Sequence, residues 1–340
     1  MPARLSVSVI IPTYNRAHLV SRAIRSALAN ILPGDDIIVV DDASTDRTAE
    51  VVRAFGPPVR YIKAAHGGAG WARNVGLQHA QGDLVAFLDS DDEWRPDRLT
   101  LQREFLARRP DVLFVFTNFC STLDTGEEEH FFLKRWHKDS RSWDDILAPG
   151  FWYSSVAPLP AGREDFRVHV GDMFLREMES DYIATSTVIA RRREAGDALH
   201  FADDIRISED KECFARLAEA GPAAYFDCET STQWGHGGPR VSDTNAHALV
   251  TSRLLLFDRI WERNAEFMAR HGDKLRQARA AQHLKRARWL LARGRTREAR
   301  EDLRLAAGVP WSYRILASVP EPLARGMIEM RSRLRSRAAV

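Results

Sequence analysis

The chain has 340 residues, of which 44% are hydrophobic and 28% charged, and a formal net charge of +2. That composition is typical of a globular protein and excludes a disordered, collagen-like or disulfide-scaffold chain. Cys120, Cys213 and Cys228 lie far apart without a CxxC pair, so their spacing indicates neither a zinc site nor a disulfide framework and fits a reducing cytoplasm. Because no run approaches the roughly 18–20 apolar residues of a membrane span and no leader pattern is present, we expect a cytoplasmic protein.

Short apolar runs alternate with amphipathic stretches through the first third of the chain. The apolar runs predict buried strands at 7–11, 37–40, 60–63, 84–88 and 112–117. The stretches between them predict helices at 18–29, 44–55, 71–80 and 96–108. This alternation predicts the α/β class, with a mostly parallel sheet covered on both faces and ligands at the carboxyl ends of its strands.

The periodicity weakens after residue 117. The stretch from Phe119 to Asp181 is rich in Pro, Gly and aromatic residues and is interpreted as a loop-rich insertion. A strand at 183–190, a helix at 211–220 and a strand at 223–226 are then expected to complete the domain.

The last part of the chain is helical and basic. Two helices are predicted around Gly294 within 275–307, as an appended hairpin. From His271 to Val340 there are 17 Lys and Arg against six Asp and Glu, whereas the first 270 residues have 32 against 41. Such a bias fits a solvated helical face, or peripheral contact with anionic lipid. Nucleic-acid binding is not supported, because basic and aromatic residues do not interleave and no known module is present.

An acidic turn follows the fourth predicted strand. Four carboxylates occur in five residues, at Asp89, Asp91, Asp92 and Glu93. Carboxylates so close together raise one another's pKa unless a cation neutralises them, and hard oxygen ligands favour Mg²⁺ or Mn²⁺ bound to a diphosphate. The alternative is a solvated acidic turn that caps the next helix.

Other strand ends carry groups that suit a nucleotide. Asp41 and Asp42 follow the second strand and can accept hydrogen bonds from a base or a ribose. Residues 12–16 follow the first strand, and the glycine-rich segment 67–70 leads into a helix that carries Arg73. Each feature alone is typical of an ordinary turn, but their convergence predicts a nucleotide-diphosphate site.

Four segments together resemble the inverting glycosyltransferase family 2. They are Ile-Pro-Thr-Tyr-Asn-Arg at 11–16, Val-Asp-Asp-Ala-Ser-Thr-Asp at 40–46, Gly-Ala-Gly-Trp-Ala-Arg-Asn at 68–74 and Phe-Leu-Asp-Ser-Asp-Asp at 87–92. The resemblance is close over about 6–97 and looser over 183–243. It implies a GT-A fold over residues 1–245, with 119–182 as an insertion facing the acceptor, followed by a basic helical extension at 246–340. Trp136 or Trp152 of the insertion can stack on a sugar, although aromatic residues are more often core.

The resemblance also implies roles for individual residues. Thr13, Tyr14 and Asp41 contact the base, usually uracil or thymine, Asp89 lies near the ribose or diphosphate, and Asp91 is the metal ligand. The full predicted nucleotide-sugar-binding set is Pro12, Thr13, Tyr14, Asn15, Arg16, Asp41, Asp42, Ser44, Gly68, Arg73, Asp89, Ser90 and Arg240.

A later acidic segment supplies the candidate base. Ser208-Glu209-Asp210 precedes the predicted helix at 211, where the family has an acidic motif, and Asp210 is the first candidate with Glu209 as a competitor. Displacing a nucleoside diphosphate with inversion needs a carboxylate to take the acceptor's proton. The alternative is that the segment only caps the helix. His236 lies where relatives often carry a histidine beside the metal, so it is a candidate ligand, and Arg240 is a candidate for the phosphates.

These observations predict a non-processive inverting glycosyltransferase that uses Mg²⁺ or Mn²⁺ and moves a sugar from a UDP- or TDP-linked donor to a carbohydrate or lipid-linked acceptor. The spaced glutamine and the Arg-Trp motif of the processive synthases are absent. The expected context is the biosynthesis of a surface polysaccharide or glycolipid at the inner face of the plasma membrane. Two alternatives remain open, a nucleotidyltransferase, which would release pyrophosphate, and a catalytically silent protein that binds sugar nucleotides.

Overall fold

The computed structural model describes residues 4–122, 125–205, 207–234, 246–320 and 322–323. The chain divides into two compact units, Met1–Gly238 and Pro239–Val340. Each unit is described by itself.

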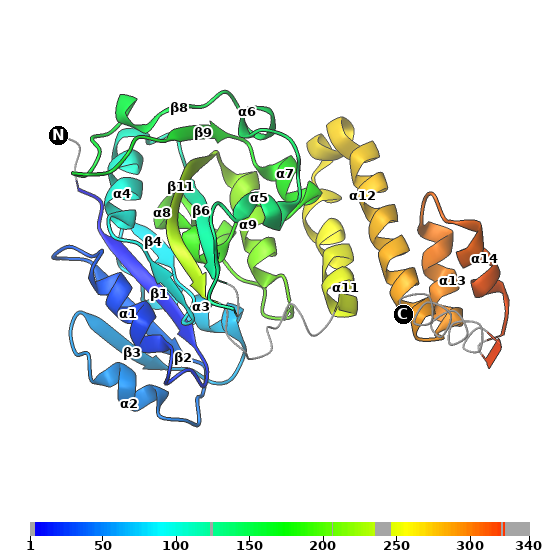
Figure 1. Cartoon of the computed structure of the whole chain (residues 1–340), viewed down its shortest axis with the longest axis horizontal. Helices are drawn as coiled ribbons and strands as arrows, with labels where there is room; N and C mark the ends of the chain where they lie inside the picture. The colour runs from blue at the N-terminus through cyan, green and yellow to red at the C-terminus, as the bar shows by residue number, and fades with distance from the viewer. Residues whose placement is uncertain (1–3, 123–124, 206, 235–245, 321, 324–340) are drawn as a thin grey trace. The chain divides into compact units, whose positions relative to one another are not determined.

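The N-terminal half of the first unit is a parallel α/β layer (Figure 1). Its strands are β1 (Val7–Thr13), β2 (Asp36–Asp41), β3 (Val59–Lys63) and β4 (Leu84–Phe87). They run parallel in the order β3-β2-β1-β4, so their carboxyl ends lie at one edge. Every residue of β1 and β4 is buried, which explains why both strands are mostly apolar. The connecting helices are α1 (Val20–Leu28), α2 (Thr48–Arg53) and α3 (Ala69–His79).

The second half of the sheet is mixed. Strand β10 (Ile189–Arg191) lies antiparallel between β4 and β6 (Phe114–Thr122), and β11 (Ala223–Trp234) runs parallel to β6. Two antiparallel strands, β9 (Arg167–Gly171) and β8 (Phe151–Trp152), extend the sheet beyond β11. Two short strands pair off this path, β5 (Asp92–Trp94) with β11 and β7 (Glu128–Glu129) with β6. The predicted α/β class with a large central sheet is confirmed, and the sheet is parallel mainly in its N-terminal half.

Helices surround this sheet and complete the first unit. They are α4 (Arg98–Arg108), α5 (Leu133–His137), α6 (Trp143–Ile146), α7 (Phe174–Glu179), α8 (Arg192–Ala195) and α9 (Glu209–Ala220), with 3-10 turns η1 (Tyr153–Ser155), η2 (Thr185–Thr187) and η3 (Gly196–Ala198). Leu99 and Phe105 of α4 belong to the same buried cluster as Val9 of β1 and Phe226 of β11. One core therefore extends under both halves of the sheet.

The second half differs from the sequence-based expectation at four places. The strand predicted at 112–117 continues to Thr122, and the one predicted at 223–226 continues to Trp234, because their polar residues pair with each other across the sheet. The strand predicted at 183–190 is only the turn η2 followed by β10. The stretch 119–181 is not only loop, since it contributes the end of β6 and strands β7, β8 and β9.

The second unit is helical. Its elements are α11 (Ala246–Leu256), the π-helical segment η4 (Phe257–Trp261), α12 (Ala265–Ala292), α13 (Thr296–Leu305) and α14 (Trp311–Ser318). Gly294, at φ +72°, lies between α12 and α13 as the sequence predicted. Buried Leu290, Leu291, Ala299 and Ala317 form the core that joins the last three helices. In the part of the chain that the structure describes, the apolar stretches of the helices are too short to cross a bilayer.

Candidate active site

The loop after β1 is hydrogen-bonded to the loop after β2. The Asn15 amide donates to Ser44 Oγ at 2.8 Å, and Asn15 Oδ1 accepts from the Thr45 amide at 2.8 Å. Asn15 adopts a left-handed conformation at φ +52°, which Asn tolerates better than most residues. The amide of Asp42 donates to the Thr13 carbonyl at 2.9 Å. These contacts bring the predicted residues at the two strand ends together.

Asp41 and Asp42 are buried and their carboxylates accept hydrogen bonds from the protein. Asp41 accepts from the Ser44 amide at 2.8 Å and from the Tyr61 hydroxyl at 2.6 Å. Asp42 accepts from the amides of Gly67 and Gly68 at 2.7 and 2.9 Å, and so holds the loop that leads into α3. Burial, together with Asp41, raises the pKa of Tyr61 to about 12. The nearby Tyr14 ring is 45% exposed and is therefore accessible to a planar ligand.

The acidic turn after β4 is arranged differently. Asp89 accepts from Arg73 Nη2 at 2.7 Å, and Arg16 Nη2 lies 3.8 Å from Asp91 Oδ2. Asp92 is buried and accepts from the Ser186 hydroxyl. Burial raises the pKa of Asp92 well above its ordinary value, and the charges of Asp91 and Asp89 add to the effect. A divalent cation held by Asp91 would relieve this crowding, and hard carboxylate oxygens suit Mg²⁺ or Mn²⁺.

Arg73 connects this turn to helix α9. Its guanidinium is buried, with Nη1 3.0 Å from Glu209 Oε1 and Nη2 on Asp89. Burial lowers the pKa of Arg73, but Asp89 and Glu209 outweigh that effect and raise the pKa above its ordinary value. Gly70 permits the approach of the two helices, because a Cβ there would lie 2.8 Å from Glu209 Cγ. The structure thus joins two segments that are 136 residues apart in the sequence.

Glu209 and Asp210 open helix α9. Asp210 Oδ1 accepts from the Lys211 amide at 2.7 Å, while Oδ2 accepts from the Thr185 hydroxyl at 3.3 Å. Burial raises the pKa of both carboxyls, with the charge of Asp210 adding to the effect on Glu209 and Arg73 opposing it in both. Ser208, at φ +73°, makes no side-chain capping bond to this helix. A carboxylate with a raised pKa suits proton transfer near neutral pH.

The predicted site residues fall into three groups. At the ends of β1 and β2 the predicted residues bond to one another, and Asp42 also holds the loop that leads into α3. After β4, Asp89 pairs with Arg73, which pairs in turn with Glu209. His236 and Arg240 lie outside the described residues, so their assignments stay predictions. Sequence reasoning missed Ser186, which accepts from the Asp89 amide at 3.1 Å and donates to Asp92. Only the fold brings Ser186 there, since it lies in the segment 183–190 that we expected to be a plain strand.

Comparison with known proteins shows which proteins this chain is similar to. Residues 8–157 match the sequence model of glycosyl transferase family 2. The chain is 36% identical over 145 residues to the putative teichuronic acid biosynthesis glycosyltransferase TuaG of Bacillus subtilis, covering 42% of this chain and 56% of that protein. It is 34% identical over 115 residues to the Escherichia coli glucosyltransferase WfgD, whose donor is named as UDP-Glc, covering 33% of this chain and 45% of WfgD. The matches thus span about half of these relatives' length.

Solved structures confirm the GT-A fold. The S. aureus protein TarS, in complex with UDP-GlcNAc, superposes with a TM-score of 0.55 at 18% identity, over 82% of this chain and 73% of that one. The mannosyltransferase PcManGT from Pyrobaculum calidifontis, in complex with GDP-Man and Mn²⁺, gives 0.53 at 19% identity, over 100% and 88% of the chains. At such identity the likeness concerns the fold alone.

Proposed function

We propose that this protein is a non-processive inverting glycosyltransferase that moves a sugar from a nucleoside-diphosphate donor, UDP- or TDP-linked, to an acceptor hydroxyl. The observation that carries the proposal is the bridge from Asp89 through Arg73 to Glu209. This bridge supports the proposal because it links Asp89, expected near the ribose or diphosphate, to Glu209, a candidate for deprotonating the acceptor. A donor and an acceptor bound there would meet between the two.

In the proposed reaction the acceptor oxygen attacks the anomeric carbon while its proton passes to a carboxylate of α9. The new glycosidic bond forms as the bond from the anomeric carbon to the diphosphate oxygen breaks, and the nucleoside diphosphate leaves with both bonding electrons. A Mg²⁺ or Mn²⁺ ion held by Asp91 would stabilise the charge on that leaving group. Because the fixed cation Arg73 already engages Glu209, we assign the base to Asp210.

The remaining site residues would position the donor. Tyr14, beside Thr13 and Asp41, offers an exposed ring for the base, and Arg16 and Arg73 supply positive charge near the acidic turn. The region 119–182 would face the acceptor, which is carbohydrate or lipid-linked. The name of the relative WfgD includes a diphosphoundecaprenol-linked acceptor, and TuaG is named for teichuronic acid biosynthesis, which favours a role in surface polysaccharide synthesis.

The test is a nucleotide-release assay with a panel of UDP-, TDP- and GDP-sugars, with Mn²⁺ and with a chelator. We expect metal-dependent release of one nucleoside diphosphate. Asp210→Asn should reduce turnover by about 10²–10⁴-fold, because it removes the base, and Glu209→Gln should reduce it less. If both variants lose the same fraction of turnover, the role of the base would be assigned to Glu209 and Asp210 together. Release of pyrophosphate would identify a nucleotidyltransferase, and binding without turnover would identify a silent sugar-nucleotide protein.

The basic region 271–340 is proposed to contact anionic lipid at the inner face of the plasma membrane. Its support is the excess of Lys and Arg in this region, with Trp311 of α14 75% exposed. Co-sedimentation with anionic vesicles should fall steeply as salt is added. No binding to such vesicles at low salt would exclude this role and leave a solvated helical face.

A further inference from the structure

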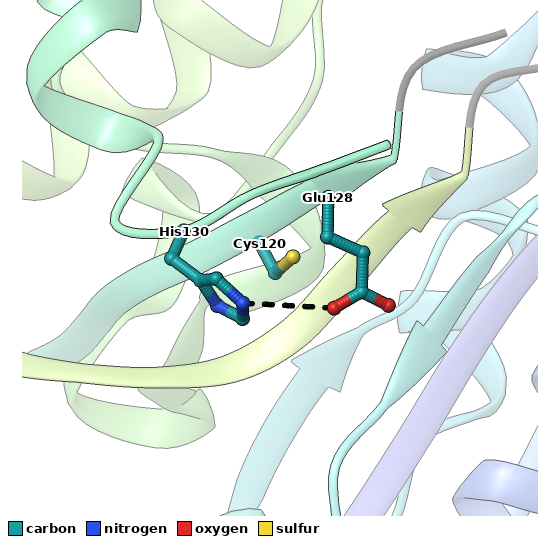
Figure 2. Close-up of side chains that lie close together, drawn as sticks. All are labelled: Cys120, Glu128 and His130. Carbon is teal, nitrogen blue, oxygen red and sulfur yellow. Dashed lines mark ion pairs between the residues drawn. The ribbon is translucent and has the colours of Figure 1, made fainter. Parts of the chain in front are cut away.

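A second cluster of possible metal ligands lies apart from the acidic turn. Cys120 on β6, Glu128 on β7 and His130 just after β7 each offer a ligand atom, and these atoms lie within 4.8 Å of one another. Figure 2 shows the three side chains brought together over the sheet. His130 Nε2 is 3.6 Å from Glu128 Oε2. Two such ligands on a tetrahedral Zn²⁺, with bonds of about 2.1 Å, would be about 3.4 Å apart.

Glu229 holds the histidine of this cluster in one orientation. Its carboxylate lies 3.1 Å from His130 Nδ1, and it is buried on β11. An ionised carboxylate only accepts hydrogen bonds, so in the neutral ring the proton on Nδ1 would be donated to Glu229 and Nε2 would present its lone pair toward Glu128. Glu229 is itself fixed by the Phe131 amide at 2.6 Å and by Arg95 Nη2 at 2.8 Å. A carboxylate behind a histidine in this way is the usual support of a metal-binding imidazole.

The ligand set suits a borderline cation and remains accessible to it. Cys120 is buried, whereas the side chains of Glu128 and His130 are 49% and 56% exposed, so an ion can enter from solvent. Burial raises the pKa of the Cys120 thiol, and Glu229 and Glu128 add to the effect. Metal binding would displace that proton, after which one thiolate and one carboxylate would balance a divalent charge. Sulfur with imidazole favours Zn²⁺ over Mg²⁺ or Mn²⁺.

We propose that Cys120, Glu128 and His130 form a Zn²⁺ site, with Glu229 as the positioning residue of His130. The cysteine spacing alone did not indicate it, because only one cysteine takes part. Thr232 of β11 pairs with Cys120 on one side and with Glu93 of β5 on the other, so one strand separates this site from the acidic turn. A bound ion would fasten the turn after β7 to β6, and its fourth position would face solvent.

The experiment uses the tag-free full-length chain, stripped with a chelator and titrated with Co²⁺ in the absence of nucleotide. We expect one Co²⁺ per chain with a thiolate-to-cobalt charge-transfer band, displaced by Zn²⁺. Cys120→Ala should abolish the band. The variants His130→Ala and Glu128→Gln, which each remove an exposed ligand, should weaken Co²⁺ binding at least about 10-fold. Glu229→Gln should weaken it by about 10–100-fold, as loss of a supporting carboxylate does.

Two matched controls separate this site from others. Cys228→Ala removes another buried free thiol, and Asp91→Ala removes the expected donor-metal ligand, so both should retain the band. Circular dichroism of each variant verifies folding. A band that survives Cys120→Ala, a loss shared with Cys228→Ala, or the absence of any band would overturn the proposal. None of these readouts depends on sugar transfer.

Discussion

The two acidic turns at the carboxyl edge of the sheet differ in what engages their carboxylates. After β2, Asp41 and Asp42 accept from backbone amides and a tyrosine hydroxyl, His66 Nδ1 lies 2.9 Å from Asp42 Oδ2, and the Asp42 side chain is only 5% exposed. After β4, Asp89 and Asp91 face arginine side chains and are 32% and 25% exposed. The carboxylates of the first turn are engaged by neighbouring parts of the protein. Those of the second turn are more exposed to solvent and to cations.

The difference shows that aspartate has two roles in this fold. Carboxylates bonded to amides fix loop geometry, because each buried amide needs an acceptor. Carboxylates held near one another, as Asp89, Asp91 and Asp92 are, keep a repulsion that a cation can relieve. The first turn should therefore matter most for stability and the second for turnover.

The largest effect should come from Asp91→Asn. If Asp91 holds the metal, turnover should fall at least about 10²-fold, because the metal supplies several kcal/mol of transition-state stabilisation. The free energy of unfolding should change little, since the substitution weakens repulsion against Asp92 and the 3.8 Å contact with the partly exposed Arg16 contributes little. Nucleotide release and urea denaturation measure the two quantities. A variant that turns over normally would contradict the contrast between the turns.

Asp42→Ala should lower the free energy of unfolding more than Asp91→Asn does. Removing this carboxylate leaves the amides of Gly67 and Gly68 without their acceptor, at a cost of about 2–4 kcal/mol of unfolding free energy. Asp42→Asn retains one acceptor oxygen and should lose about half as much. Urea denaturation of the three proteins gives the comparison. If Asp42→Ala is as stable as the parent, the first turn is not the structural element we infer.

The carboxylates around α9 predict how stability changes with pH. Glu177 is buried beside Lys211, and burial raises its pKa to about 7. Its carboxyl in the unfolded chain titrates near 4.5, so the folded state retains a proton that the unfolded state loses. Its contribution is fully present below pH 4.5 and is lost as the pH rises through about 7. The loss should amount to roughly 3 kcal/mol.

Glu177→Gln tests this directly by thermal denaturation in a chelator between pH 4.5 and 8. The parent should lose stability across that pH range more steeply than the variant, because the variant has no titrating group at position 177. Glu179→Gln is a matched control on the same helix, because the arginines Arg141 and Arg176 help to lower the pKa of Glu179. Parallel curves for the parent and Glu177→Gln would show that Glu177 titrates normally.

The sequence predicts the first half of the fold well and the second half poorly, for a physical reason. Strands β1, β2 and β4 are mostly apolar because both faces are covered, so composition alone locates them. The ends of β6 and β11 contain polar residues such as Asn118 and Thr230, which are buried nonetheless. In the sequence alone such polar residues predict a loop. They form a strand because they pair with neighbouring strands of the sheet.

The candidate site follows the same division. The aspartates at the strand ends could be predicted because each lies in a short motif between a strand and the helix that follows it. The Arg73–Glu209 contact could not be predicted, since nothing local marks two residues 136 positions apart as neighbours. Ser186 was missed for the same reason, because its hydroxyl meets Asp92 across 94 residues of chain.

Ser44→Ala should have the smallest effect and sets the scale for the first turn. The change removes the acceptor of the Asn15 amide but leaves a partly buried donor that water can reach, so the cost should be about 1 kcal/mol. Thr45→Ala is the matched control, because Thr45 binds Asn15 chiefly through its amide. Thermal denaturation and the affinity for UDP measure both variants. If Ser44→Ala costs as much as Asp42→Ala, the loops depend on hydroxyl and carboxylate acceptors alike, and the turn acts as one cooperative network rather than through its acids.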